Sequence, residues 1–253
     1  MSFKVKWFRR LIQIIALIIL LLPIWFEGLI WYGTYISAEL VGIELTDPLT
    51  TLEITLASRA VWTPLIISAL PLAIVAIIFG RVFCSYVCPL NFLLELLPVK
   101  RKKILQTRTL PLVALGIVLA LSAILAVPIF NTASPVFALM RMMIFGVGIE
   151  IILLALVIGA AFIWGQKIWC RTLCPLGAIY GLLGLKKFLA VKVDKDKCIN
   201  CGRCEKVCSM GTSPLKSDFA DKVLCTNCGD CIDACPKKAL SFMNLLSLFG
   251  QRK

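Results

Sequence analysis

The chain has 253 residues, 60% of them hydrophobic, and a mean hydropathy of +0.92, far above the values typical of soluble globular domains. Its net charge of +13 could suit nucleic-acid binding, but most of the basic residues flank apolar runs, which disfavours that partner. The absence of histidine excludes histidine-ligated haem, Rieske centres and imidazole proton relays.

Four apolar runs follow one another along the first part of the chain. Each has about the 20 residues that a transmembrane helix requires, and they cover residues 11–31, 60–80, 110–130 and 145–165. They predict an all-α integral membrane domain, residues 1–185, in which four transmembrane helices form two repeated hairpins. A cleaved signal peptide is the alternative for the first run, but that run is long for one and no A-x-A site follows it.

Basic residues gather before the first apolar run and again between the second and third runs. By the positive-inside rule these segments lie in the cytoplasm, so both chain termini are expected on that side. The sequence therefore predicts a multi-pass protein of the cytoplasmic (inner) membrane, with its N- and C-termini in the cytoplasm.

Two similar cysteine motifs come directly after the second and fourth runs, "FGRVFCSYVCPL" (79–90) and "WGQKIWCRTLCPL" (164–176). Each contains a C-x3-C-P pattern, and the four cysteines are Cys84, Cys88, Cys170 and Cys174. Because each half of the repeat is a complete hairpin, all four thiols are expected at the same cytoplasmic face. The proline after each pair opens a helix, whose dipole favours the thiolate form.

Four thiolates are the ligand set of one iron–sulfur cluster, so the C-x3-C-P cysteines are candidate catalytic residues that predict a cluster of their own. Three alternative roles stay open for these thiols. They could be buried apolar filler, could exchange electrons as dithiol and disulfide, or could bind copper transiently. Stable disulfides are disfavoured because the predicted compartment is reducing.

A polar tail, residues 186–253, contains two C-x2-C-x2-C-x3-C runs, which are typical of two-cluster bacterial ferredoxins. The tail therefore predicts a small cytoplasmic α+β ferredoxin-like domain with two 4Fe–4S clusters. The fourth cysteine of each run ligates the other cluster in this pattern. The first cluster is then held by Cys198, Cys201, Cys204 and Cys235, and the second by Cys225, Cys228, Cys231 and Cys208.

Two features of the tail refine this interpretation. Ser209 stands where proline usually follows the first run, but the eight thiols remain and proline is not a ligand. Zinc is the alternative for C-x2-C pairs, but the close spacing of four cysteines in each run suits a cubane cluster better.

With these motifs the sequence resembles the NapH-type family of membrane ferredoxins, the quinol dehydrogenase membrane component of periplasmic nitrate reductase systems. The resemblance covers nearly the whole chain: the four apolar runs, both C-x3-C-P motifs and the two four-cysteine runs. Similar modules occur in the C-terminal part of the nitrous oxide reductase regulator, and in methylamine utilisation and cytochrome oxidase assembly proteins.

The resemblance implies electron exchange between the membrane quinone pool and a redox partner, with the C-x3-C-P cysteines essential to it. The expected activity is that of a quinol dehydrogenase-type electron-transfer subunit, and the expected partner is another iron–sulfur protein or a cytochrome subunit of a reductase complex. A metal-reducing assembly factor and a redox-sensing regulatory module are the alternatives. The direction of electron flow stays open, because cluster potentials depend on their surroundings.

Overall fold

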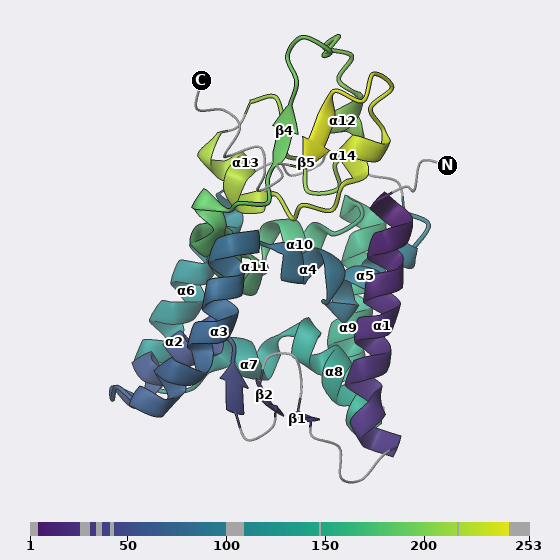
Figure 1. The fold of residues 1–253 in the computed structure, drawn as a ribbon. Helices are drawn as coiled ribbons and strands as arrows, with labels where there is room; N and C mark the ends of the chain where they lie inside the picture. The colour runs from purple at the N-terminus through teal and green to yellow at the C-terminus, as the bar shows by residue number, and fades with distance from the viewer. Residues whose placement is uncertain are drawn as a thin grey trace.

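The computed structural model describes residues 5–25, 31–33, 37–40, 43–99, 109–146, 148–216 and 218–242. A body of helices carries a smaller cysteine-rich part at one end, and the first helix runs along the side of the body up to that part (Figure 1). The helices of the body are α1 Val5–Trp25, α2 Pro48–Ser58, α3 Thr63–Phe79, α4 Val82–Tyr86, α5 Pro89–Leu96, α6 Leu110–Leu125, α7 Ile129–Ala133, α8 Pro135–Phe145, α9 Glu150–Trp164, α10 Ile168–Thr172 and α11 Pro175–Leu183.

Short elements complete the fold. A 3₁₀ turn, η1 Gly184–Lys186, leads from α11 toward the cysteine-rich part. That part contains the helices α12 Arg203–Val207, α13 Phe219–Leu224 and α14 Asp230–Asp233, and an antiparallel pair of strands, β4 Val191–Val193 and β5 Leu240–Phe242. At the opposite end of the body lies an antiparallel three-stranded sheet of β1 Trp31–Gly33, β2 Ser37–Leu40 and β3 Ile43–Thr46.

The helices differ from the prediction in one decisive respect. Within the described ranges, no helix combines the length and the apolar character that crossing a bilayer demands. The prediction of four transmembrane helices is therefore wrong. The predicted multi-pass location in the cytoplasmic membrane, with both termini inside, is wrong with it.

The apolar runs are longer than the helices that they contain. Helix α3 has 17 residues, α6 has 16 and α9 has 15, because glycines or left-handed residues end them. At 1.5 Å per residue, 17 residues rise about 26 Å, which is short of the roughly 30 Å of a hydrocarbon core. Helix α1 has 21 residues, but Lys6, Arg9 and Arg10 occupy its first turns.

The sequence repeat is visible as a repeat of helices. The succession α2, α3, α4, α5 has the same order of long and short helices as α8, α9, α10, α11. The short helices α4 and α10 have five residues each, and a proline at the first position opens both α5 and α11. Helix α2 is capped by Asp47 and α8 by Ser134, whose side chains accept backbone N–H groups of the first turn.

Helix α11 occupies the centre of the molecule. Its residues from Pro175 to Gly181 are all buried, and it contacts α3, α6 and α13. Two glycines, Gly181 on α11 and Gly184 on η1, permit this close approach. A Cβ added to Gly181 would lie 2.3 Å from the Val223 carbonyl oxygen, and one added to Gly184 would lie 2.3 Å from the Gly80 Cα.

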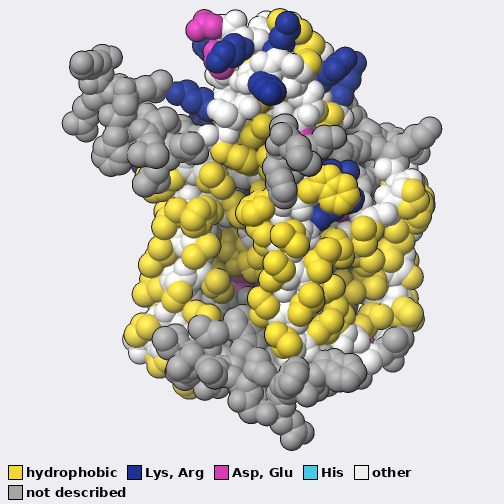
Figure 2. All heavy atoms as spheres, turned by 45° about the vertical axis from the view of Figure 1, so that its right-hand side comes forward, with side chains coloured by type: hydrophobic (Ala, Val, Ile, Leu, Met, Phe, Trp, Pro, Cys, Tyr) yellow, Lys and Arg dark blue, Asp and Glu magenta, His cyan; other side chains and the backbone are white. Residues whose placement is uncertain are grey.

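The face of the helical body seen in Figure 2 is largely apolar. Large hydrophobic side chains are exposed along α3, α6 and α9, among them Ile67, Leu70, Ile117, Ile124, Ile152 and Leu156. Charged side chains gather instead over the cysteine-rich part (Figure 2). Contiguous apolar surfaces of this kind mark places where a protein contacts apolar partners.

Candidate iron–sulfur sites

The twelve cysteines are all free thiols, and they line three cavities. We name these the inner, middle and outer sites by their distance from the helical body. The inner site contains Cys84, Cys88, Cys170 and Cys174. The middle site contains Cys208, Cys225, Cys228 and Cys231, and the outer site contains Cys198, Cys201, Cys204 and Cys235.

The inner site is built by the helix repeat. Cys84 lies within α4 and Cys170 within α10, while Cys88 and Cys174 are the residues directly before α5 and α11. The loop geometry is the same in both halves, because the Cys88 N–H donates to the Phe83 carbonyl at 3.1 Å and the Cys174 N–H to the Trp169 carbonyl at 3.1 Å. Residues distant in sequence thus bring four sulfurs to one cavity.

The inner thiols are not activated as the helix-dipole argument predicts. Burial raises the pKa of all four, and the other sulfurs of the site raise it further at Cys88, Cys170 and Cys174. The pKa of Cys170 reaches about 11. Desolvation outweighs the backbone N–H groups of Asn91 and Gly177, which lower the pKa of Cys88 and Cys174. These thiols therefore keep their protons unless a bound metal displaces them, as metal coordination does.

A buried arginine completes the wall of the inner site. Arg81 is 1% exposed and lines the cavity together with the four thiols. Its guanidinium donates to the Cys170 carbonyl at 3.2 Å, and at longer range to the Val223 and Leu224 carbonyls at 3.4 and 3.5 Å. Arg81 therefore joins the repeat motif to the segment that precedes Cys225.

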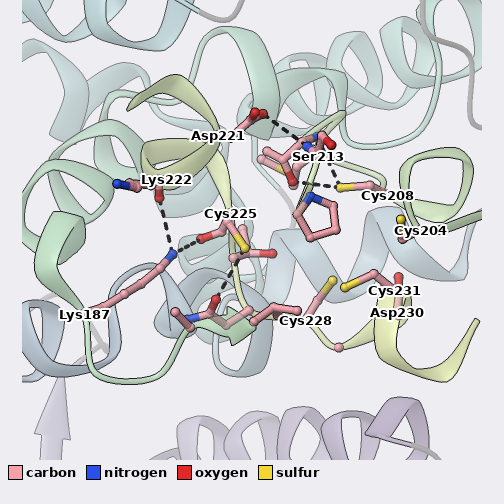
Figure 3. A pocket seen from close by; sticks show the side chains of 18 of the residues that line it. Lys187, Cys204, Cys208, Ser213, Asp221, Lys222, Cys225, Cys228, Asp230 and Cys231 are labelled. Carbon is pink, nitrogen blue, oxygen red and sulfur yellow. Dashed lines mark hydrogen bonds between the residues drawn. The ribbon is translucent and has the colours of Figure 1, made fainter. Parts of the chain in front are cut away.

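The middle site lies between α13, α14 and the loop after α12 (Figure 3). Burial raises the pKa of Cys228 to about 11, and that of Cys231 is raised as well. The Thr212 N–H donates to the Cys208 sulfur at 3.4 Å. Lys187 reaches in from the end of η1 and donates to the Cys225 carbonyl at 3.1 Å (Figure 3). A cation and a backbone amide thus face this group of sulfurs.

The outer site is the most accessible of the three, because Cys201 is exposed. The Ala239 N–H donates to the Cys235 sulfur at 3.3 Å, four residues after the cysteine, as Thr212 does after Cys208. This shared contact shows that the two four-cysteine runs fold alike at their ends. Backbone N–H groups directed at sulfur suit thiolate ligands, whose potentials such bonds tune.

An asparagine in each run escaped the sequence interpretation. Asn200 and Asn227 stand between the first two cysteines of their runs and have positive φ angles of 51° and 52°. The Cys225 thiol donates to the Asn227 side chain at 3.4 Å, and that side chain donates to the Phe79 carbonyl at 3.2 Å. The tolerance of asparagine for left-handed backbone was the signal that could have identified both.

Neighbouring sites share walls. Met210 and Thr226 line both the inner and the middle cavities, and Cys204 lines both the middle and the outer cavities. The three sites therefore form a continuous series from the end of the helical body that meets the cysteine-rich part to the exposed Cys201.

The donor sets fit iron–sulfur clusters better than single ions. Among the described residues, no three Cys, Asp or Glu side chains gather tightly enough to hold one metal ion. Zinc needs four ligands around one ion, whereas a cubane takes four thiolates around a larger cage. The inner and outer cavities are each lined by four cysteines, and the middle cavity by five because it shares Cys204 with the outer one. These thiols, with amide donors to sulfur at two of the cavities, are consistent with the cage.

Comparison with known families agrees with this chemistry. One 4Fe–4S binding domain model matches residues 61–108 and 145–194, which contain the two C-x3-C-P motifs. A second 4Fe–4S binding domain model matches residues 190–212, which contain the first four-cysteine run. These matches and the cysteine sites define an iron–sulfur protein of the ferredoxin type.

Similar proteins narrow the class further. The chain is 33% identical to the methylamine utilization ferredoxin-type protein MauN of Paracoccus denitrificans, over 80% of this chain and 76% of the relative. It is 34% identical to the ferredoxin-type protein NapH of Escherichia coli and 35% identical to NapH of Haemophilus influenzae, in each case over 79% of this chain and 73% of the relative. No solved structure matches the chain. The chain belongs to the NapH and MauN family of ferredoxin-type 4Fe–4S electron-transfer proteins, which confirms the predicted resemblance.

Proposed function

We propose that this ferredoxin-type protein transfers electrons between a quinone and a protein redox partner by way of three 4Fe–4S clusters, one at each cysteine site. In this proposal residues 186–253 form the ferredoxin-like domain and residues 1–185 the helical domain. The eight cysteines of the middle and outer sites would hold two clusters, and the inner cysteines would hold the third. Such clusters supply one-electron transfer, so several of them can divide the two electrons of a quinol.

The observation that carries the proposal is the continuity of the three sites. Met210 and Thr226 separate the inner from the middle cavity, and Cys204 separates the middle from the outer cavity. Because each of these side chains lines two neighbouring cavities, no wide layer of protein lies between adjacent sites. The inner site is enclosed by helices, whereas the outer site reaches the surface at Cys201.

An apolar groove beside the inner site supports quinone as the small-molecule partner. The groove runs along α9 and α10 and includes Trp169 and Leu173, the residues directly before Cys170 and Cys174. Trp164 and Leu156 form part of its wall, and nearly all of its lining is apolar. The indole nitrogen of Trp169 is buried and has no hydrogen-bond partner among the described residues. A quinone is an apolar ring with carbonyl acceptors, and it therefore matches such a groove.

The surface at the outer site supports a protein as the second partner. Cys201 is exposed, and the neighbouring Ile199 side chain is 58% exposed. Exposed apolar side chains beside a redox site provide a contact area for a protein that must approach closely. Another iron–sulfur protein or a cytochrome subunit of a reductase complex has the required one-electron chemistry.

Counting iron tests the number of clusters. The wild-type protein, purified without oxygen, should contain about twelve irons per chain, four for each cubane. A variant with all four inner cysteines changed to alanine should contain about eight, by the same count. A variant lacking the four outer cysteines is the control and should also fall to about eight. Eight irons in the wild type would remove the inner cluster from the proposal.

Filling the groove tests the quinone. Ala160 lines the groove, whereas Ala155 lies on the same helix, is exposed and is not part of it. Ala160→Trp should slow the oxidation of the dithionite-reduced protein by a quinone at least tenfold, with the iron content unchanged. Ala155→Trp should react like the wild type. Equal quinone rates in all three proteins would exclude this groove as the site of quinone contact.

A further inference from the structure

We propose that Arg81 is the fixed positive charge that raises the reduction potential of a cluster at the inner site. This inference rests on the proposed function, because it requires that the inner site hold a cluster. It assigns a role to a residue that is neither a ligand nor part of the quinone groove. Arg81 would act through the electric field that it imposes on the four inner cysteines.

The position of Arg81 leaves its charge without compensation. The side chain is 1% exposed, and its oxygen acceptors are three backbone carbonyls, those of Cys170, Val223 and Leu224. Among the described residues, no carboxylate forms an ion pair with it. Its Nε is buried and also lacks a partner within the described part of the chain. Carbonyl dipoles solvate a guanidinium but do not neutralise it.

The surrounding backbone holds the guanidinium in place. A Cβ added to Gly177 would lie 1.9 Å from the Arg81 Nη2 and 2.8 Å from its Cζ. Gly177 stands three residues after Cys174, in the first turn of α11. The glycine therefore provides the space in which the guanidinium lies beside the inner cysteines.

Physical chemistry then gives the direction of the effect. Arginine keeps its charge in proteins, and an unpaired buried charge is costly unless an opposite charge lies near. Neutral thiols do not provide that opposite charge, whereas four thiolates around a cluster do. Reduction adds one more negative charge, and a nearby cation favours the state with more negative charge. Arg81 would therefore make the inner cluster easier to reduce.

The second repeat provides a matched comparison. Lys167 stands three residues before Cys170, as Arg81 stands three residues before Cys84. Lys167 is also buried, at 3% exposure, but its Nζ lies 3.5 Å from a carboxylate oxygen of Glu95. The same carboxyl group pairs with Arg9. The sulfurs of the two halves are symmetric, but the charges around them are not.

A redox titration followed by electron paramagnetic resonance tests the inference. The signal of the inner cluster is the one that disappears when the four inner cysteines are changed to alanine. Arg81→Gln should lower its reduction equilibrium constant at least tenfold, which is 59 mV for one electron. Arg81→Lys retains the charge and should stay near the wild-type potential. Lys167→Gln should shift the potential less than Arg81→Gln, because Glu95 offsets much of the Lys167 charge.

The outcomes separate this inference from the proposed function. A wild-type protein with eight irons would contradict the inner cluster itself. Twelve irons in the wild type and in Arg81→Gln, with equal inner potentials, would overturn the role of Arg81 alone. If Arg81→Gln does not fold, Gly177→Ala displaces the guanidinium while keeping its charge. An inner potential that falls in Gly177→Ala supports the inference, and an unchanged one overturns it.

Discussion

Asp47 shows how one buried residue combines a structural and an electrostatic role. Its carboxylate accepts the N–H groups of Leu49 and Thr50 at the start of α2, and the Tyr180 hydroxyl donates to it at 2.5 Å. Burial raises the pKa of Asp47 to about 6 in spite of these hydrogen bonds. The fold therefore holds a carboxyl group that gains a proton as the pH falls through about 6.

This shift predicts how stability depends on pH. The folded pKa of Asp47 lies above its ordinary value of 3.8, so the folded state binds the proton more tightly than the unfolded state. The contribution of Asp47 favours folding most at low pH and is lost as the pH rises through about 6, by about 3 kcal/mol in all. Asp47→Asn keeps the cap and should reduce the fall in Tm between about pH 5 and 7.5.

Glu53 could contribute a pH dependence of the same sign as Asp47, because burial also raises its pKa and it lies close to Asp47. The experiment therefore needs a control for Glu53. A residual pH dependence of the same sign should therefore persist in Asp47→Asn and disappear in the double variant with Glu53→Gln. Identical Tm profiles for Asp47→Asn and the wild type would show that Asp47 does not titrate in this range.

At the level of elements, α11 depends on its glycines for contact with its neighbours. Gly181 lies in the last turn of the helix, against the Val223 backbone of α13. A glycine in a helix interior normally costs about 0.5–1 kcal/mol relative to alanine. Its presence here indicates that close packing against the cysteine-rich part outweighs helix propensity.

Two glycine-to-alanine changes separate these effects. Gly181→Ala should lower the free energy of unfolding by about 1–3 kcal/mol, because the new methyl group overlaps the Val223 carbonyl. Gly159→Ala in α9 is the matched control, since no atom lies within 4 Å of its added Cβ. The control should stabilise the protein by roughly 0.5–1 kcal/mol. Denaturant titration measures both, and equal effects would exclude the proposed overlap.

Helix ends explain why the apolar runs misled the sequence analysis. The run at 60–80 contains Pro64 at the start of α3 and Gly80 directly after its end. The run at 145–165 contains Gly146 and Gly165 on either side of α9, both with positive φ angles. Hydropathy counts apolar residues without regard to backbone conformation, so it overestimated the lengths of α3, α6 and α9.

At the scale of the whole molecule, Arg9 ties three parts of the chain together. It is 1% exposed and pairs with Glu95 of α5 at 2.5 Å and with Asp230 of α14 at 2.9 Å. It also donates to the Cys228 carbonyl at 2.7 Å. Helix α1 is thereby anchored both to the helical body and to the middle cysteine site.

Removing this charge should loosen that junction. Arg9→Gln should lower the free energy of unfolding by about 3–5 kcal/mol, because breaking a buried ion network leaves charges poorly compensated. Arg10→Gln is the control, since Arg10 is partly exposed and its guanidinium lies 5.8 Å from the Trp7 ring centre. That change should cost less than about 1 kcal/mol. Hydrogen exchange should increase in α1 and α14 only in Arg9→Gln, and equal exchange in both variants would contradict the anchoring role.

The sequence indicated the cysteine chemistry more reliably than the fold around it. Spacing alone grouped the cysteines in fours and identified the repeat, because ligand geometry requires that spacing. Buried cations such as Arg9, Arg81 and Lys167 were hidden, since basic residues beside apolar runs have the pattern of topology signals. Their partners lie far away in the sequence, at Glu95, Asp230 and the Val223 carbonyl, and only the folded chain brings them together.

The matching helices of the two halves also bear on the evolutionary origin of the inner site. Each half carries only two of its four sulfurs, so a chain with a single half could complete the site only by pairing with a second copy of itself. A two-fold dimer is therefore the simplest ancestor that the repeat suggests, with its two subunits joined by a gene duplication. Fusion then let the two halves diverge. Arg81 in the first half now corresponds to Lys167 in the second, and Asp47 corresponds to Ser134. Two identical subunits could not differ in this way.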